Sequence, residues 1–485
     1  MVNVFEILVI VVLLLSLVNP FLKKKIKEKY VLISILFFIL LDLLINSYRW
    51  AMSLVYGLAL ILIVINLFKL KSSSEKVITK NQKIFRIILT IIAVLVLIAA
   101  IILLAMFPVV DLPKPTGEYN VGTTYMNFKD DSRLEVLTDN PDDYRELEAR
   151  IWYPIDDVSS NKDVLSYRES FENFGSINYM GSFPSFIFGH YRLAKTNSYL
   201  DEPVSSKFDS YPVLFFSTGF LSRNDDYQLF MEELASNGYI VISLKQSYES
   251  RSVVKPSGEI IPFTKEHGDG YKRHIDITLP FWKRFWASNN TEEKIAISKE
   301  IIESDTFMDE VLDIRTSDIQ FVVDELEKIE STEILYDKLD LENLGIFGHS
   351  MGGAVAGQTC FVDNRFKAGI NLDGFQWGDV MSGITTQPFM IVYSEPFAYA
   401  NDFVLDNYNN TLYQLAIKGS THTNFDDNMI VMPITKKIGM VGSIDKNRMQ
   451  EISNEYIVSF FDRYLKNEDV SFAEFDEVEF EIVHY

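Results

Sequence analysis

The sequence predicts an α/β domain, with a mostly parallel sheet covered by helices, that follows four transmembrane helices. Three features support this prediction: four apolar stretches near the N-terminus, a change in charge after them, and an alternation of short apolar runs with helical patterns in the remainder. The chain has 485 residues, with 45 basic and 67 acidic side chains and a formal charge of −22. This length allows about two to four domains.

The apolar stretches cover about residues 2–22, 30–50, 51–70 and 84–108. Each is long enough, at a rise of about 1.5 Å per residue, to cross a hydrocarbon core of about 30 Å. A cleaved signal peptide is the alternative for the first stretch, but residues 1–5 carry no basic side chain and no small-residue cleavage site follows. We therefore expect a transmembrane region at 1–110, a linker at 111–118 and a catalytic domain at 119–485.

The positions of the lysines predict the orientation, because basic loops stay on the cytoplasmic side. Five lysines lie between Lys23 and Lys29, and six basic residues lie between Lys69 and Arg86. These two loops should be inside, so both termini and the large domain should be exoplasmic. Glu6 and Asp42 lie in or beside the spans, and we interpret them as residues near the outer interface, because a charge at mid-bilayer is costly.

Composition excludes several classes of protein. Residues 1–112 hold 12 basic and 5 acidic side chains, which leaves a net charge of −29 on residues 113–485. So acidic a domain is an unlikely partner for nucleic acid. The single cysteine, Cys360, cannot form a disulfide within the chain. Without an H-E-x-x-H motif or clustered His and Cys residues, we expect no metal and no cofactor.

The large domain alternates between strand-like and helix-like segments, which is typical of a mostly parallel sheet. Strands are predicted at 149–153, 213–217, 239–244, 344–349, 367–372, 388–394 and 411–417, and helices at 227–236, 308–329, 351–361 and 449–465. Two long polar and aromatic stretches, at about 155–211 and 247–306, interrupt this alternation. Insertions of this length are usually lids or extra packing layers.

The strongest local motif is Gly348-His349-Ser350-Met351-Gly352-Gly353, between a predicted strand and a predicted helix. A sharp strand-to-helix turn lifts a serine hydroxyl to the top of the sheet, and it requires small residues on both sides of that serine. The motif therefore predicts Ser350 as a nucleophile. A plain glycine-rich turn is the alternative.

A serine hydroxyl becomes a good nucleophile only when a base, here a histidine, takes its proton. In this type of fold the order along the chain is serine, acid, histidine. Only His422 and His484 come after the motif, and His422 is favoured because it lies on a loop just past the last predicted strand. The spacing leaves three candidates for the acid: Asp373, Glu395 and Asp379.

The negative charge of a tetrahedral intermediate requires backbone N–H donors. One donor should be Met351, the residue after the nucleophile. The other should come from the turn Ser217-Thr218-Gly219-Phe220-Leu221, most simply from Phe220. That turn could alternatively be only a tight corner.

Several of these patterns together resemble the platelet-activating factor acetylhydrolases of the plasma, or isoform II, type, a family of α/β-hydrolases. The similarity covers roughly residues 113–467. Its motifs are the opening at 115–124, Arg150-Ile151-Trp152-Tyr153-Pro154, the turn at 217–219, Arg315-Thr316-Ser317-Asp318, the elbow at 348–353, Leu372-Asp373-Gly374 and the loop at 419–425. The family often has Ser-His-Gly-Leu-Gly where this chain has 217–221, so this turn departs from the pattern.

The resemblance implies an α/β-hydrolase fold with Asp373 as the acid, Ser350 as the nucleophile, His422 as the base, and the N–H groups of Phe220 and Met351 as the oxyanion hole. Together with the four apolar stretches, which lie outside the similarity, it implies a membrane-anchored serine ester hydrolase that cleaves short-acyl esters, phospholipid esters among them. The partners would be a small-molecule or lipid ester and the membrane. An exoplasmic acyltransferase with the same triad and a non-catalytic binding or sensing module are the alternatives. The oligomeric state is left open.

Overall fold

The computed structural model describes residues 3–46, 48–71, 79–158, 162–167, 185–250, 253–254 and 260–484. The chain divides into two compact units, which are described separately. The first consists of Met1–Asp111, Ser185–Ala194 and Val431–Ile434, and the second of Leu112–Pro184, Lys195–Ile430 and Thr435–Tyr485.

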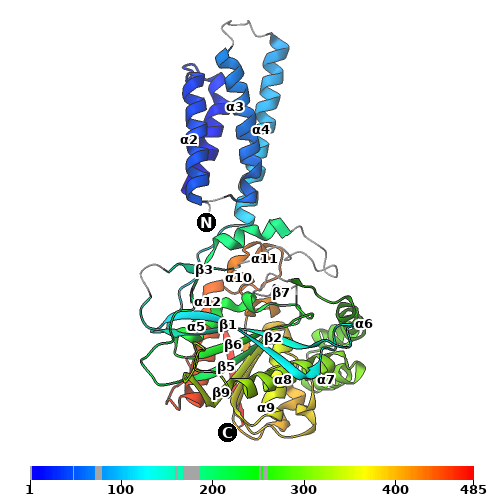
Figure 1. The fold of residues 1–485 in the computed structure, drawn as a ribbon. Coiled ribbons are helices and arrows are strands. Elements are labelled where there is room, and N and C mark those ends of the chain that lie inside the picture. Colours follow the sequence, from blue (N-terminus) through cyan, green and yellow to red (C-terminus); the bar gives the residue numbers. More distant parts are fainter. Residues whose placement is uncertain are drawn as a thin grey trace. The chain divides into compact units, whose positions relative to one another are not determined.

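Four long helices make up most of the first unit (Figure 1). They are α1 (Val4–Val18), α2 (Glu28–Asn46), α3 (Ser53–Lys71) and α4 (Lys80–Met106), with short 3₁₀ helices at Asn19–Phe21, Trp50–Met52 and Ser185–Leu193. Among the described residues, three helical stretches are long and apolar enough to cross a membrane: Val4–Phe21, Trp50–Lys71 and Lys80–Met106. Helix α2 is not among them, so three of the four predicted spans are supported and the span at 30–50 stays a prediction.

Glu6 and Asp42 are buried and have hydrogen-bond partners. Arg49 donates from Nη1 to both carboxylate oxygens of Glu6, at 3.0 Å each, and from Nη2 to the carbonyl oxygens of Leu104 and Phe107. One guanidinium therefore joins α1, the connection between α2 and α3, and the end of α4. Asp42 accepts hydrogen bonds from Asn46 and Tyr56.

The second unit is built on an 11-stranded sheet in the order β13-β12-β11-β10-β9-β5-β6-β2-β1-β4-β3. The six strands from β12 to β6 run parallel to their neighbours, whereas β13 and β2 pair antiparallel at the two ends of this block. The strands are β1 (Asn120–Leu134), β2 (Tyr144–Ile155), β3 (Val164–Ser166), β4 (Lys195–Leu200), β5 (Tyr211–Ser217), β6 (Ile240–Lys245), β9 (Leu339–His349), β10 (Phe366–Leu372), β11 (Phe389–Ser394), β12 (Leu412–Ile417) and β13 (Val478–His484), with a separate hairpin of β7 (Val253–Val254) and β8 (Ile260–Ile261).

Helices connect these strands. They are α5 (Gln228–Ser236), α6 (Lys265–Ala287), α7 (Thr291–Ser304), α8 (Phe307–Leu326), α9 (Met351–Val362) and α12 (Lys446–Leu465), with 3₁₀ helices at Asn224–Tyr227, Asp379–Ser382, Glu395–Phe397, Asp402–Asn407 and His422–Phe425. The short helices α10 (Asn428–Val431) and α11 (Ile434–Lys437) each include residues of both units.

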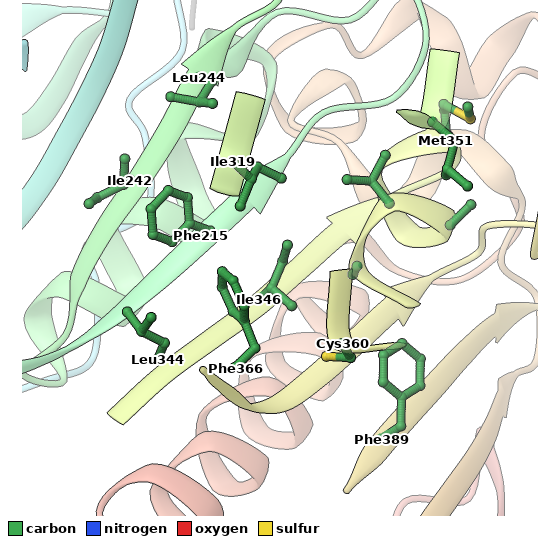
Figure 2. Packing of buried hydrophobic residues seen from close by; sticks show 14 of the residues in the cluster. Phe215, Ile242, Leu244, Ile319, Leu344, Ile346, Met351, Cys360, Phe366 and Phe389 are labelled. Atoms are coloured by element: carbon green, nitrogen blue, oxygen red, sulfur yellow. The ribbon is translucent and has the colours of Figure 1, made fainter. Parts of the chain in front are cut away.

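Alternate residues of β9 face different helical layers, because successive side chains of a strand point to opposite faces. Leu344 and Ile346 belong to the main core cluster, together with Ile319 of α8 (Figure 2). Phe347 instead packs edge-on against Phe461 of α12, at 5.9 Å between ring centroids. The sheet is therefore covered on both faces, which explains why its central strands are almost wholly apolar.

All seven strands and four helices expected from the sequence are present, with ends that differ by a few residues. The stretch at 247–306 contains α6 and α7, which are helical because their apolar residues recur at helical spacing. In the stretch at 155–211, residues 168–184 lie outside the described residues, and β3 and β4 extend the sheet. Strand β13 was not predicted.

Candidate active site

Ser350 lies on the sharp turn between β9 and α9. Its backbone has φ 57° and ψ −122°, a conformation that non-glycine residues rarely adopt and that clusters at functional sites. A Cβ on Gly352 would lie 1.9 Å from the carbonyl oxygen of Ser217, and a Cβ on Gly348 would lie 2.1 Å from the carbonyl oxygen of Gly352. Only glycine fits at both positions, as the motif predicts.

His422 and Asp373 form a hydrogen-bonded pair. His422 Nδ1 lies 2.8 Å from Asp373 Oδ2, and the Asp373 side chain is fully buried whereas His422 is 38% exposed. Asp373 also accepts from Ser394, at 2.6 Å from the backbone N–H and 2.8 Å from the hydroxyl. A carboxylate oxygen accepts hydrogen bonds, so His422 Nδ1 is the donor in this contact.

The other candidates left open by spacing lie elsewhere. Glu395 accepts a hydrogen bond from the N–H of Gly419 at 2.6 Å, so it supports the loop of His422. Asp379 accepts one from the amide of Gln358 at 3.1 Å. His484 is the last residue of the edge strand β13.

His422 lies beside the residue that precedes the serine. Its ring is 4.6 Å from that of His349, centroid to centroid, and its carbonyl oxygen is 3.0 Å from His349 Nε2. Within the described part of the chain, no hydrogen bond joins His422 to the Ser350 hydroxyl. Hydrogen bonds of this kind often tighten only when substrate binds.

The turn after β5 lies against Ser350. A Cβ on Gly219 would be 3.4 Å from Ser350 Cβ. The Phe220 ring stacks on Tyr271, at 4.4 Å, and on His267, at 5.3 Å, both from α6. For the N–H groups of Phe220 and Met351, no acceptor is found among the described residues.

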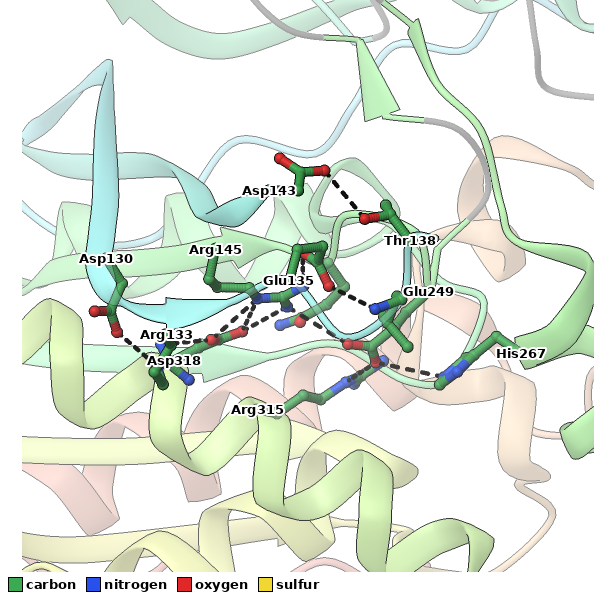
Figure 3. Close-up of polar contacts among 12 residues, drawn as sticks. Asp130, Arg133, Glu135, Thr138, Asp143, Arg145, Glu249, His267, Arg315 and Asp318 are labelled. Atoms are coloured by element: carbon green, nitrogen blue, oxygen red, sulfur yellow. Dashed lines mark hydrogen bonds and ion pairs between the residues drawn. The ribbon is translucent and has the colours of Figure 1, made fainter. Parts of the chain in front are cut away.

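A buried network of charges supports this turn (Figure 3). Arg315 donates from Nη1 to the Thr218 carbonyl at 2.6 Å and from Nε to Glu249 at 2.9 Å. Arg145 lies 3.7 Å from the other oxygen of Glu249 and 2.7 Å from Asp318. The fork of the Arg315 guanidinium thus joins the turn to a buried carboxylate.

His267 closes this network on the side of α6, with Nε2 at 4.0 Å from Glu249. Burial lowers the pKa of His267, against the attraction of Glu249. A neutral imidazole stacked on Phe220 adds no charge to the oxyanion turn.

Aromatic side chains flank the other side of His422. The Phe397 ring lies 5.7 Å from the His422 ring, and Trp282 lies 5.2 Å from Phe397. Trp286 contacts both Phe397 and Trp282 and is 46% exposed. These rings form a continuous apolar surface from the imidazole to solvent.

The residues around the site give no sign of a metal centre. Among the described residues, no group of three or more His, Cys, Asp or Glu side chains is placed to hold a metal ion. Cys360 is fully buried in the core cluster, where burial raises the pKa of its thiol.

Sequence reasoning missed three side chains that hold the site: Ser394, Tyr227 and Arg315. Ser394 ends β11, beside the end of β10, and the carboxyl ends of neighbouring parallel strands are where polar site residues collect. That signal could have identified it. Tyr227 ends a 3₁₀ helix and has no local motif for such a role, whereas Arg315 belongs to the motif Arg315-Thr316-Ser317-Asp318 of the family resemblance, to which no role was assigned.

The sheet order, the strand–serine–helix turn and the paired histidine and aspartate define an α/β-hydrolase. A solved structure, a ferulic acid esterase from Streptomyces cinnamoneus, has the same fold, with a TM-score of 0.58 at 21% identity over 77% of this chain and 99% of that one. The predicted fold class is thus confirmed for the second unit.

The chain belongs to the family described as platelet-activating factor acetylhydrolase, isoform II, whose model matches residues 104–479. It is 26% identical over 387 residues to a platelet-activating factor acetylhydrolase of Cavia porcellus, covering 75% of this chain and 80% of the relative. It is 23% identical over 390 residues to a probable 1-alkyl-2-acetylglycerophosphocholine esterase of Arthroderma benhamiae, covering 74% and 89%. The chain is a carboxylic ester hydrolase.

Proposed function

We propose that the chain is a membrane-anchored serine esterase in which Ser350 is the nucleophile, His422 the general base and Asp373 the residue that orients the base. The observation that carries this proposal is the 2.8 Å contact between His422 Nδ1 and the buried Asp373, on a loop next to the strained turn of Ser350. In this proposal the contact keeps the imidazole proton on Nδ1, so that Nε2 can accept the proton of Ser350.

In the first half of the reaction, Ser350 Oγ attacks the ester carbonyl carbon while its proton moves to His422 Nε2. The carbonyl oxygen becomes an oxyanion, which the N–H groups of Phe220 and Met351 stabilise. One such donor is typically worth about 2.7–4 kcal/mol. The imidazolium then gives its proton to the alkoxy oxygen, the C–O bond breaks, and the alcohol leaves.

In the second half, water replaces the alcohol. The water oxygen attacks the acyl-enzyme carbonyl while His422 Nε2 takes a proton from the water. When the tetrahedral intermediate collapses, the His422 imidazolium gives that proton to Ser350 Oγ. The products are a carboxylic acid and the free enzyme. The full cycle consumes one ester and one water molecule and returns Ser350 and His422 to their starting states.

The proposed substrate is a short-acyl ester, with an acetyl glycerophospholipid as the specific candidate. The named relatives act on such a lipid, to judge from their descriptions. Three apolar helices near the N-terminus would keep the enzyme at a lipid surface. The lysine distribution supports a catalytic domain on the exoplasmic side.

The test is the Ser350→Ala variant of the full chain in detergent or nanodiscs, assayed with p-nitrophenyl acetate and with 2-acetyl and 2-palmitoyl glycerophosphocholines. We expect the variant to lose ester hydrolysis and labelling by a fluorophosphonate, with the 2-acetyl lipid the better substrate of the wild type. The matched control is Ser298→Ala, since Ser298 is a buried serine that donates to the Ala400 carbonyl. Hydrolysis that persists in Ser350→Ala would refute the mechanism.

Sidedness needs its own measurement. We expect a membrane-impermeant fluorophosphonate to label the wild-type chain in intact cells that express it, at the same level as in lysed cells. Labelling that appears only after lysis would place the catalytic domain on the cytoplasmic side.

A further inference from the structure

A chain of hydrogen bonds connects the turn after β5 to the loop of His422 through two buried side chains. The Gly219 N–H lies 3.2 Å from Tyr227 Oη, Tyr227 Oη lies 2.9 Å from His349 Nδ1, and His349 Nε2 lies 3.0 Å from the His422 carbonyl oxygen. Tyr227 is 0% and His349 is 3% exposed.

The direction of each hydrogen bond follows from the chemistry of its atoms. A carbonyl oxygen only accepts, so His349 Nε2 carries the proton that is donated to His422. Burial lowers the pKa of His349 well below its ordinary value, so the ring is neutral and Nδ1 is an acceptor. The Tyr227 hydroxyl donates to Nδ1, and its oxygen in turn accepts from the Gly219 N–H.

Each end of this chain adjoins a part of the proposed catalytic machinery. Gly219 immediately precedes Phe220, whose N–H is the proposed oxyanion donor, and it lies against Ser350. At the other end is the backbone of His422 itself. In the middle, His349 is the covalent neighbour of Ser350. Three segments that are far apart in sequence are therefore tied together at the nucleophile.

We propose that Tyr227 and His349 are positioning residues of the esterase, which hold the oxyanion turn and the loop of His422 in register with Ser350. This inference rests on the proposed function. Neither side chain touches the reacting atoms. Their effect is on the placement of the Phe220 N–H and of the His422 imidazole, where small displacements are costly because catalysis depends on preorganised geometry.

Tyr227→Phe tests this inference with little change in packing, because only the hydroxyl is removed. In the full chain we expect kcat to fall about tenfold or more, with KM changed less than twofold, since the loss is felt mainly in the transition state. A trifluoromethyl ketone that forms an oxyanion on Ser350 should lose affinity in parallel with kcat/KM. A non-reactive ether analogue of the substrate should bind as before.

The matched control is Tyr153→Phe. Tyr153 is also 0% exposed, and its hydroxyl donates to the Glu202 carbonyl at 2.8 Å. This variant loses a buried hydroxyl of the same kind but should keep kcat and the affinity for the ketone. Equal losses in both variants would mean a general structural effect and would overturn the inference.

His349 provides a second test. His349→Gln can still donate to the His422 carbonyl, whereas His349→Phe can make neither hydrogen bond, so we expect a smaller loss of kcat in the glutamine variant. Unchanged kcat and ketone affinity in Tyr227→Phe, together with an inactive Ser350→Ala, would overturn the positioning role alone. Activity in Ser350→Ala would overturn the proposed function and this inference with it.

Discussion

Ser394 donates two hydrogen bonds to Asp373, one from its backbone N–H to Oδ1 and one from its hydroxyl to Oδ2. The Asp373 N–H in turn donates to the carbonyl of Val392, on the neighbouring strand β11. The carboxylate is thus oriented by the strand that ends beside it. Its Oδ2 is shared between the serine hydroxyl and His422 Nδ1.

Removal of the Ser394 hydroxyl should weaken this orientation without abolishing it. For Ser394→Ala we expect kcat to fall about tenfold or more, since a hydrogen bond to a charged group is worth about 1.5–3 kcal/mol, and KM should stay unchanged. Steady-state hydrolysis of p-nitrophenyl acetate measures both. Ser298→Ala is the control, and a Ser394→Ala variant with wild-type kcat would show that the backbone N–H suffices.

Asp373→Asn tests which of the three acids orients His422. An amide nitrogen opposite Nδ1 would favour the wrong imidazole tautomer, and in a serine protease triad the equivalent change costs about 10⁴ in kcat. We expect a loss of that order for Asp373→Asn and less than tenfold for Glu395→Gln and Asp379→Asn. A larger loss in either of the latter two would reassign the acid.

The network below the oxyanion turn should matter chiefly for stability. Glu249→Gln removes the negative charge that lies between the guanidinium groups of Arg315 and Arg145 (Figure 3). All three side chains are buried. Loss of one partner of a buried ion pair costs about 3–5 kcal/mol. The matched control is Glu300→Gln, since Glu300 pairs with Arg284 on the surface, where such pairs contribute about 0–1 kcal/mol.

Thermal unfolding of the full chain in nanodiscs measures both changes. We expect a marked fall in the unfolding temperature for Glu249→Gln and almost none for Glu300→Gln. Equal temperatures for the two variants would contradict the role assigned to the network.

Whether a residue of the candidate site could be predicted from the sequence depends on how far away in the sequence its partners lie. Ser350 could be identified because its turn is encoded by its immediate neighbours, Gly348 and Gly352. The choice of Asp373 over the other acids came from a family resemblance, because only the strand order brings it to His422. Tyr227 and Arg315 could not be assigned, since the contacts that matter are with His349, Thr218 and Glu249, which lie 122, 97 and 66 residues away in the sequence.

The strands also differ in how much of their structure is encoded in their own residues. The central strands were predicted because burial on both faces makes each a short, nearly continuous apolar run. Strand β13, at one edge of the sheet, was missed because strands were assigned from short, nearly continuous apolar runs, whereas Val478–His484 alternates apolar and charged residues, the pattern of a half-buried strand. Its pairing with β12 is a tertiary property.

The buried imidazole of His349 should make stability depend on pH. Its pKa is lowered well below 6.5 in the folded chain, so the unfolded state binds the proton more readily, and stability rises with pH wherever that holds. The contribution of His349 is complete above about pH 7 and is lost progressively as pH falls from about 6.5. In His349→Gln, the unfolding temperature should therefore fall less steeply between pH 7.5 and 5 than in the wild type. Parallel curves would contradict the assignment of a neutral, buried ring.

The ion pair between Glu6 and Arg49 should hold the N-terminal helices together. Both side chains are almost fully buried, at 3% and 4% exposure, so Arg49→Gln leaves a buried carboxylate without its partner. We expect a destabilisation of about 3–5 kcal/mol. The double variant Glu6→Gln/Arg49→Gln should recover part of this loss, because two neutral amides can share a hydrogen bond and neither charge remains buried.

A double-mutant cycle on the unfolding temperature of the full chain in nanodiscs measures the coupling, which for contacting residues is about 0.5–3 kcal/mol. The control is Lys83→Gln, on an exposed position of α4, where a change within about 0.5 kcal/mol is expected. If Arg49→Gln and Glu6→Gln instead had additive effects no larger than that of Lys83→Gln, neither the ion pair nor the hydrogen bonds from Arg49 to the carbonyls of Leu104 and Phe107 would stabilise the helices.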